Sequence, residues 1–364
     1  MRYINSFRNP EASLVLNRQI QELGSRLESF METVHIMEVC GTHTMAIGRH
    51  GIRNILPANI KLLSGPGCPV CVTDSGYIDA AIELAEKGII LATFGDMIYV
   101  PGSESTLAEC RSRGLRIEVC YSPAEAVEIA KTHPDQEVVF LAVGFETTAP
   151  PVVSIIEMAE REKIRNLSLL VAFKLVPPAL EVLMTDPQVQ IDAFLCPAHV
   201  SAIIGSKPYE AVVEKYHIPC VIAGFEPLDI LLGIKGILQQ LVEKVPCVEN
   251  QYSRVVRPDG NTMAQEMMHR YLEPADVVWR GLGSIPLSGL QLRPGFAAYD
   301  AAIKFGMAIP HGKYDPRCRC GEVIKGIVNP DQCGLFRKVC TPENAIGPCM
   351  VSEEGTCAAY YKYS

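Results

Sequence analysis

The sequence has little that would suit a nucleic acid, a membrane or a nucleotide. Lys and Arg number 33 against 41 Asp and Glu, so the formal net charge is −8, whereas binding a phosphate backbone needs clustered basic residues. No apolar run reaches the roughly 18 residues that a membrane helix requires. Neither a Gly-x-Gly-x-x-Gly fingerprint nor a Gly-Lys-Ser/Thr phosphate loop occurs. We therefore expect no nucleic acid, no membrane and no nucleotide as a partner.

A secretion signal is missing as well. The first ten residues lack the basic start and the apolar run of a signal peptide, so we expect a soluble protein of the cytoplasm. The 364 residues suffice for two or three domains, and a hydrophobic fraction of 48% suffices for a buried core.

Cysteine, in contrast, is abundant. A cytoplasmic chain with 14 cysteines is more readily explained by metal binding or redox chemistry than by a disulfide framework. Three cysteines lie in the N-terminal fifth and six lie between Cys318 and Cys357. The other five are scattered, and all of them except Cys196 are interpreted as small core hydrophobes: Cys110, Cys120, Cys196, Cys220 and Cys247.

The hydrophobic pattern predicts an α/β fold. One amphipathic helix is followed by alternating strand and helix patterns, which indicates two lobes of parallel sheet with helices on both faces. Beyond Gly281, Gly, Pro and Cys dominate, and such a segment needs a staple such as a metal cluster. We predict an N-terminal helical segment with a Cys/His motif, a first lobe, a second lobe and a C-terminal iron–sulfur module at residues 1–59, 60–135, 136–280 and 281–364.

The six C-terminal cysteines suit a cluster best. They are Cys318, Cys320, Cys333, Cys340, Cys349 and Cys357. Thiolates bind both iron–sulfur clusters and structural zinc. Zinc modules usually have Cys-x2–4-Cys knuckles, which this segment lacks, so the long and unequal spacings favour a cluster. Zinc or no metal remain alternatives, and spacing alone does not select four ligands.

Two further motifs carry cysteine near the N-terminus. Cys68 and Cys71 form a Cys-x-x-Cys, which can close a disulfide or hold a metal, or can be two buried thiols in a tight turn. Cys40 and His43 follow a predicted strand and could together bind one soft metal ion, although such a pair is more often structural.

Polar residues also follow several predicted strands. Parallel α/β sheets bind ligands outside the carboxyl ends of their strands, so these residues together predict a lined cleft. A single acid in such a place is more often a helix cap or a solvated residue. The residues are Asp96, Glu146, Lys174, Cys196, His199 and Glu226.

Several stretches resemble the HypD family of hydrogenase maturation proteins, and they span nearly the whole chain in order. Met45 stands where some members have a second histidine, which puts a ligand role at that position in doubt. The stretches lie at residues 37–44, 65–72, 143–150, 196–201 and 318–352.

The resemblance implies a scaffold for assembling the iron centre of nickel–iron hydrogenases, an iron that carries two cyanides and one carbon monoxide. It implies the small chaperone HypC as a partner, and HypE as the cyanide donor that HypF charges. The family's cluster pattern, Cys-x14-Cys-x6-Cys-x16-Cys, implies a 4Fe–4S cluster on Cys318, Cys333, Cys340 and Cys357.

The resemblance also implies roles for the remaining cysteines. Cys320 and Cys349 resemble a redox-active pair, and Cys40 matches the family's essential thiol, where iron would be held transiently with His43. We hypothesise that electrons pass from the cluster through Cys320/Cys349 and Cys68/Cys71 toward this iron by thiol–disulfide exchange. A second hypothesis places His43, Asp96, Glu146, His199 and Glu226 around the same iron.

Two other readings use the same residues. An iron–sulfur disulfide reductase would turn over a thiol–disulfide substrate and form no stable partner complex. An interaction module with a purely structural metal would tolerate replacement of Cys40. We expect an assembly scaffold with redox activity rather than an ordinary turnover enzyme.

Overall fold

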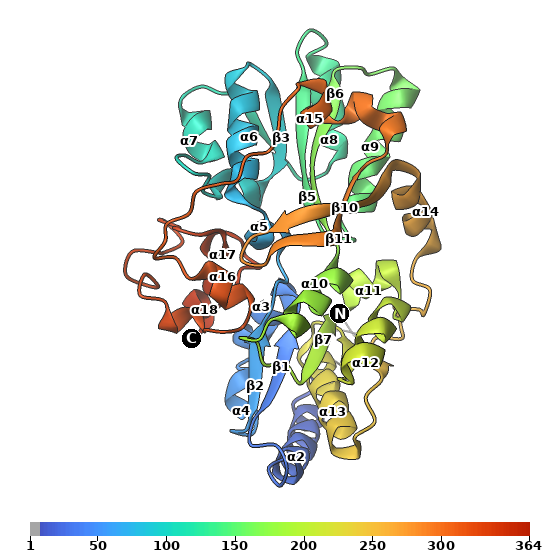
Figure 1. Cartoon of the computed structure of the whole chain (residues 1–364), viewed down its shortest axis with the longest axis vertical. Coiled ribbons are helices and arrows are strands. Elements are labelled where there is room, and N and C mark those ends of the chain that lie inside the picture. The colour runs from blue at the N-terminus through green and yellow to red at the C-terminus, as the bar shows by residue number, and fades with distance from the viewer. Residues whose placement is uncertain (1–7) are drawn as a thin grey trace.

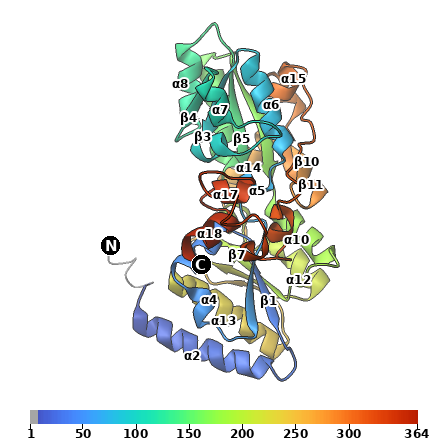
Figure 2. The ribbon, with the colours of Figure 1, turned by 90° about the vertical axis from the view of Figure 1, so that its left-hand side faces the viewer.

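The computed structural model describes residues 8–364 and has two lobes stacked along its long axis (Figure 1). Each lobe contains one β-sheet. The C-terminal segment lies at one side, where the two lobes meet (Figures 1 and 2). Among the described residues no helix is both long enough and apolar enough to cross a membrane.

The lower lobe of Figure 1 holds a five-stranded, fully parallel sheet of order β2-β1-β7-β8-β9. Its strands are β1 (Val34–Glu38), β2 (Ile60–Ser64), β7 (Ala193–Pro197), β8 (Cys220–Ala223) and β9 (Val248–Asn250). The helices of this lobe are α2 (Pro10–Leu27), α3 (Gly41–Arg49), α4 (Ile52–Ile55), α11 (Ala198–Ile204), η2 (Lys207–Tyr209), α12 (Glu210–Tyr216) and α13 (Pro227–Glu243).

The upper lobe holds a six-stranded sheet of order β10-β11-β6-β5-β3-β4. Four strands are parallel: β3 (Ile90–Phe94), β4 (Ile117–Cys120), β5 (Val138–Gly144) and β6 (Leu167–Lys174). An antiparallel hairpin extends this sheet through β10 (Leu272–Trp279) and β11 (Gly283–Leu292). The helices here are α6 (Ser75–Glu86), η1 (Gly95–Tyr99), α7 (Leu107–Ser112), α8 (Ala124–Thr132), α9 (Ala149–Glu162), α14 (Thr262–Tyr271), η3 (Pro294–Tyr299) and α15 (Ala301–Lys304). Helix α10 (Val176–Thr185) lies where the lobes meet, against β11 and α12 (Figure 1).

Alternation along the strands builds cores on both faces of each sheet. In β1, Ile36 packs with residues of α2 and α13, whereas its neighbour Met37 belongs to a core on the other face. This follows from the two-residue period of a strand. The predicted α/β class is confirmed, with sheets that are mainly parallel; the antiparallel hairpin of the upper sheet was not part of the prediction.

The strands of each sheet do not come from one continuous segment of the chain. Residues 60–135 contribute β2 to the lower sheet and β3 and β4 to the upper one. Residues 136–280 likewise supply strands to both sheets. The chain therefore crosses between the lobes several times, and the crossings bring distant cysteine motifs to one place.

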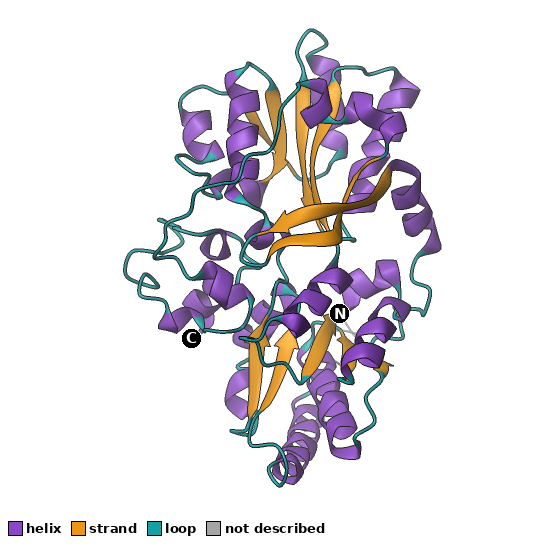
Figure 3. Ribbon diagram, viewed as in Figure 1, coloured by secondary structure: helices purple, strands orange, loops and turns teal. Residues whose placement is uncertain are grey.

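The C-terminal module, here residues 305–364, consists of short helices joined by loops (Figure 3). The helices are α16 (Cys320–Ile324), η4 (Pro330–Gln332), α17 (Pro348–Val351) and α18 (Thr356–Tyr363). Helix α17 packs on α5 (Pro69–Val72), and α18 packs on α3. The core of the module is continuous with the core that spans both lobes.

Candidate functional site

Five of the six C-terminal cysteines line one cavity: Cys318, Cys320, Cys333, Cys340 and Cys357. The other lining residues are mostly apolar and include Val323, Leu335, Phe336 and Met350. All these cysteines are free thiols. A set of thiols in an apolar cavity suits a thiolate-bound cluster, because sulfur is the soft ligand that such clusters use.

Close packing of these thiols depends on Gly347. A Cβ atom at this position would lie 2.7 Å from Sγ of Cys320 and 2.8 Å from Sγ of Cys318. The neighbouring thiol of Cys320, followed by burial, raises the pKa of Cys318. Within residues 8–364, no three His, Cys, Asp or Glu side chains converge closely enough to hold a single metal ion. The cavity is therefore the feature that defines this candidate cofactor site.

The sixth C-terminal cysteine connects the cavity to the Cys-x-x-Cys motif. Cys349 is buried on α17, and its thiol interacts with the thiols of Cys320 and Cys71. Hydrogen bonds from Cys320 and then Cys71 lower the pKa of Cys349 to about 6. Burial, and then the neighbouring thiols of Cys349 and Cys68, raise the pKa of Cys71. A continuous series of thiols thus runs from Cys320 through Cys349 and Cys71 to Cys68.

The Cys-x-x-Cys motif forms the first turn of α5. Cys68 is its N-cap and accepts a hydrogen bond from the Cys71 backbone N–H, with 3.3 Å between N and Sγ. Pro69 follows at the first helical position, where its missing N–H costs no hydrogen bond. The thiol of Cys71 donates to the carbonyl oxygen of Pro348 at 3.8 Å. The turn therefore fixes both thiols against α17.

Cys40 lies directly beside this motif. It follows the end of β1 by two residues and is the buried N-cap of α3, and Gly41 N–H donates to the carbonyl oxygen of Gly67 at 3.1 Å. A Cβ atom at Gly67 would lie 2.3 Å from both N and Cα of Cys40. Only glycine permits this approach of the two backbones. Burial, and then the charge of Glu354, raise the pKa of Cys40 to about 12.

His199 is the predicted site residue whose imidazole lies beside the Cys40 thiol. Its Nδ1 and Nε2 atoms lie 3.9 and 4.0 Å from Sγ of Cys40. His43 is buried nearby, and its Nε2 lies 2.9 Å from the carbonyl oxygen of Gly224. The two imidazoles flank Phe225, at centroid distances of 4.8 Å for His43 and 5.2 Å for His199. Burial lowers the pKa of each histidine to about 4, so both are neutral at pH 7.

Asp96 reaches the site through the C-terminal module. It accepts a hydrogen bond from Ser352 Oγ at 3.2 Å. Burial, and to a smaller extent the charge of Asp96, raise the pKa of Glu354. Glu354 in turn accepts a hydrogen bond from Thr42 Oγ1 at 2.8 Å. Its negative charge contributes to the raised pKa of Cys40. The sequence analysis did not identify Glu354, because a loop glutamate carries no signal until the fold places it beside α3.

Two predicted acids make other contacts. Glu146 is buried, and its Oε1 accepts from the Val176 backbone N–H at 2.8 Å, while Oε2 has no partner in the part of the chain that the structure describes. Burial raises the pKa of Glu146 to about 7. Glu226 forms an ion pair with Arg8 at 2.5 Å and is partly exposed. Within residues 8–364, neither acid forms a hydrogen bond or ion pair with Cys40.

Arg280 is a second residue that the sequence did not reveal. It is 7% exposed, its backbone N–H donates to the carbonyl oxygen of Val72 at 2.8 Å, and its guanidinium lies 4.4 Å above the Tyr314 ring. Its positive charge lowers the pKa of Cys349, although less than the thiol hydrogen bonds do. Arg280 therefore joins α5, the thiol series and the strap at residues 310–316.

Comparison with known proteins assigns this arrangement to a class. A family model described as "HypD: Hydrogenase formation hypA family" matches residues 15–364. The chain is 44% identical to hydrogenase maturation factor HypD2 of Bradyrhizobium diazoefficiens, over 100% of this chain and 97% of that protein. It is 41% identical to hydrogenase maturation factor HypD of Escherichia coli K12, over 100% of this chain and 98% of that protein.

The class is that of the hydrogenase maturation factors, since these identities of 41–44% extend over the whole chain. Within this class, the chain belongs to the HypD family.

Proposed function

We propose that this chain is the scaffold on which the iron of nickel–iron hydrogenases receives two cyanides and one carbon monoxide, in a cytoplasmic complex with the chaperone HypC and with HypE as cyanide donor. The observation that supports it most strongly is the continuous series of thiols between the C-terminal cavity and Cys68, whose loop packs on Cys40. An assembly site that must be kept reduced benefits from such a connection.

The cavity cysteines are the proposed ligands of a 4Fe–4S cluster: Cys318, Cys333, Cys340 and Cys357. When bound, this cluster would supply single electrons to the neighbouring thiols. Cys320 lines the same cavity and also contacts Cys349, so the Cys320/Cys349 pair adjoins the cluster site.

The Cys320/Cys349 pair is positioned to reduce a Cys68–Cys71 disulfide. The Cys349 thiolate, favoured by its lowered pKa, attacks Sγ of Cys71 and displaces the Cys68 thiolate. Cys320 then attacks Cys349 and releases Cys71. The net step transfers two electrons and two protons, forms one disulfide at Cys320/Cys349 and breaks one at Cys68/Cys71.

Cys40 is the proposed thiol that holds the iron cargo during assembly. It must lose its proton to bind iron, and the neutral imidazole of His199, 3.9 Å away, is the adjacent base. His43 is turned toward Gly224, so its contribution would be through its Nδ1 atom, which is buried and has no partner within residues 8–364. A thiol from HypC would complete the soft donor set.

Maturation with a Cys68→Ser/Cys71→Ser variant tests the proposal. In a strain that lacks its own factor, this variant should fail to restore hydrogenase activity while its anaerobic iron–sulfur absorption remains that of the wild type. A Cys247→Ser variant, which changes an exposed cysteine away from the site, serves as the matched control. Normal hydrogenase activity in the double variant would exclude the thiol route.

A disulfide reductase is the second candidate, because the same series of thiols could reduce an external substrate. The two functions differ in what they need from Cys40. Catalytic reduction of a small disulfide by the Cys40→Ser variant, at the wild-type rate and without any partner complex, would favour the reductase.

A further inference from the structure

Strand β2 forms a free edge of the lower sheet. Its sheet neighbour is β1, and it stands first in the strand order. Asn59 O accepts from Val34 N–H at 2.8 Å, and Gly65 N–H donates to Glu38 O at 2.8 Å. In a parallel strand such bonds alternate between the two sides. The odd-numbered residues therefore face β1, and the N–H and C=O of Leu62 face outward.

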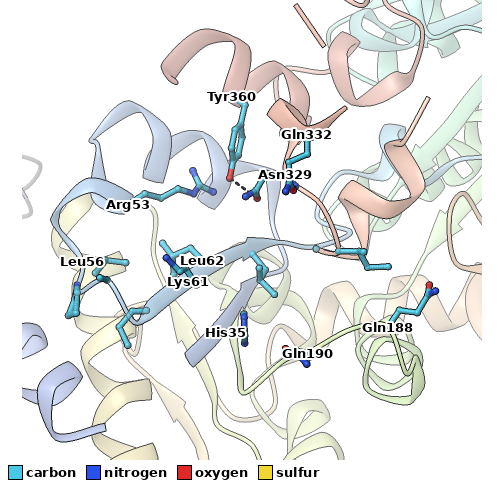
Figure 4. A pocket seen from close by; sticks show the side chains of 16 residues that line it. His35, Arg53, Leu56, Lys61, Leu62, Gln188, Gln190, Asn329, Gln332 and Tyr360 are labelled. Carbon is cyan, nitrogen blue, oxygen red and sulfur yellow. Dashed lines mark hydrogen bonds between the residues drawn. The ribbon is translucent and has the colours of Figure 1, made fainter. Parts of the chain in front are cut away.

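A groove of about 420 Å³ runs along this edge, between β2 and the C-terminal module. Figure 4 shows Lys61 and Leu62 on the strand, with Tyr360, Asn329 and Gln332 of the module across from them. Apolar side chains of the strand and of the loop before it, including Leu56 and Ile60, form part of the lining.

Of the described residues, three basic side chains and no acidic one line the groove: His35, Arg53 and Lys61. Arg53 is paired with Glu38, and His35 Nδ1 lies 3.5 Å from Asp192 Oδ2. Lys61 is exposed and has no ion-pair partner among residues 8–364. The other polar side chains are the Tyr360 hydroxyl and four amides, which both donate and accept hydrogen bonds: Gln188, Gln190, Asn329 and Gln332. The unpaired ammonium of Lys61, in a groove that the described chain lines without an acidic side chain, favours an acidic ligand by charge complementarity.

We infer that this groove docks an extended acidic segment of a partner protein, which adds to the lower sheet as a strand beside β2. The outward N–H and C=O groups of the strand supply backbone hydrogen bonds, and alternate side chains of the segment meet the apolar lining. Lys61 and the amides recognise its carboxylates. Arg53, which lines the groove, forms an ion pair at 3.0 Å with Glu38. Glu38 precedes Cys40 by two residues, so the groove is connected to the candidate site. The inference does not depend on what the C-terminal cysteines bind.

A fluorescein-labelled peptide provides the first test with the full-length protein. The probe has about eight residues, alternating Val with Glu, which is the length of an ordinary strand. We expect it to bind with a fluorescence anisotropy change, and we expect the same peptide with Lys in place of Glu to bind at least about tenfold more weakly. N-methylation of alternate backbone nitrogens, on the side that faces β2, should abolish binding.

Variants and hydrogen exchange locate the binding. Lys61→Glu should weaken binding of the acidic peptide by about fivefold, whereas Lys87→Glu, the same charge change at the end of α6 in the upper lobe, should leave it unchanged. The bound peptide should slow hydrogen exchange at the Leu62 amide. Equal binding of acidic and basic peptides, or binding without protection of Leu62, would overturn the inference. Concentration-dependent dimerisation of the chain that the peptide cannot compete would also overturn it, because a second copy would then be the occupant.

Discussion

Because the backbones of Gly67 and Cys40 are in close contact, adding one methyl group at Gly67 should disturb both stability and function. In Gly67→Ala, the new Cβ would lie 2.3 Å from N and Cα of Cys40 and 2.5 Å from its carbonyl carbon. Backbone atoms cannot rotate away as a side chain does, so one of the two segments must move. Overpacking of this kind costs about 3 kcal/mol, which corresponds to a decrease in Tm of about 4 °C for a chain of this length.

The functional effect should exceed the effect on stability. Displacing the loop separates Cys68 from Cys40, so hydrogenase maturation by Gly67→Ala should fall strongly while the C-terminal cysteines keep their iron. The matched control is Gly295→Ala, because nothing lies within 4 Å of the Cβ that it would add. Thermal unfolding and activity of a complemented hydrogenase measure both effects. A Gly67→Ala protein with wild-type Tm and activity would refute the close approach.

Two other predictions concern the buried groups. Glu146→Gln should change how the free energy of unfolding depends on pH. In the folded protein the Glu146 carboxyl has a pKa of about 7, above its unfolded value of about 4.3. The stability that the protonated carboxyl contributes is therefore present below pH 4 and is lost as pH rises through 7. Relative to wild type, the variant should therefore gain about 3 kcal/mol between pH 4 and pH 8 in urea unfolding, and parallel pH profiles would contradict this. Gly347→Ala should reduce the iron content of the purified protein, because its Cβ would collide with Cys318 and Cys320; Gly334→Ala, where nothing lies within 4 Å of the added atom, should retain it, and equal iron in both variants would argue against the cavity as the cluster site.

The fold class could be predicted from the sequence because its signal is local. Continuous apolar runs such as β5, buried at every position, are typical of central parallel strands. The β10–β11 hairpin was not predicted, because Pro274 and Pro286 interrupt the strand pattern. The pairing of β1 with β7 joins residues more than 150 positions apart, and no local pattern carries such information.

In the candidate site, too, some residues carry a local sequence signal and others become relevant only in the folded chain. Its cysteines and His199 could be selected from residue type and motif, and the structure brings Cys40 and His199 side by side. Arg280 and Glu354 could not be selected, because an arginine at a strand end and a loop glutamate become relevant only when the chain folds back onto α5 and α3. The position of Cys349 between Cys320 and Cys71 likewise depends on α17 packing against α5.

The central claim is that the cluster ligands and the iron-assembly thiol are separate sites, and iron and sulfide analysis of the anaerobically purified protein tests it most directly. Wild type, Cys333→Ser and Cys40→Ser would be compared together with their absorption spectra. The account predicts about four irons per chain, lost in Cys333→Ser and retained in Cys40→Ser. Zinc in place of iron, or loss of the cluster in Cys40→Ser, would contradict it.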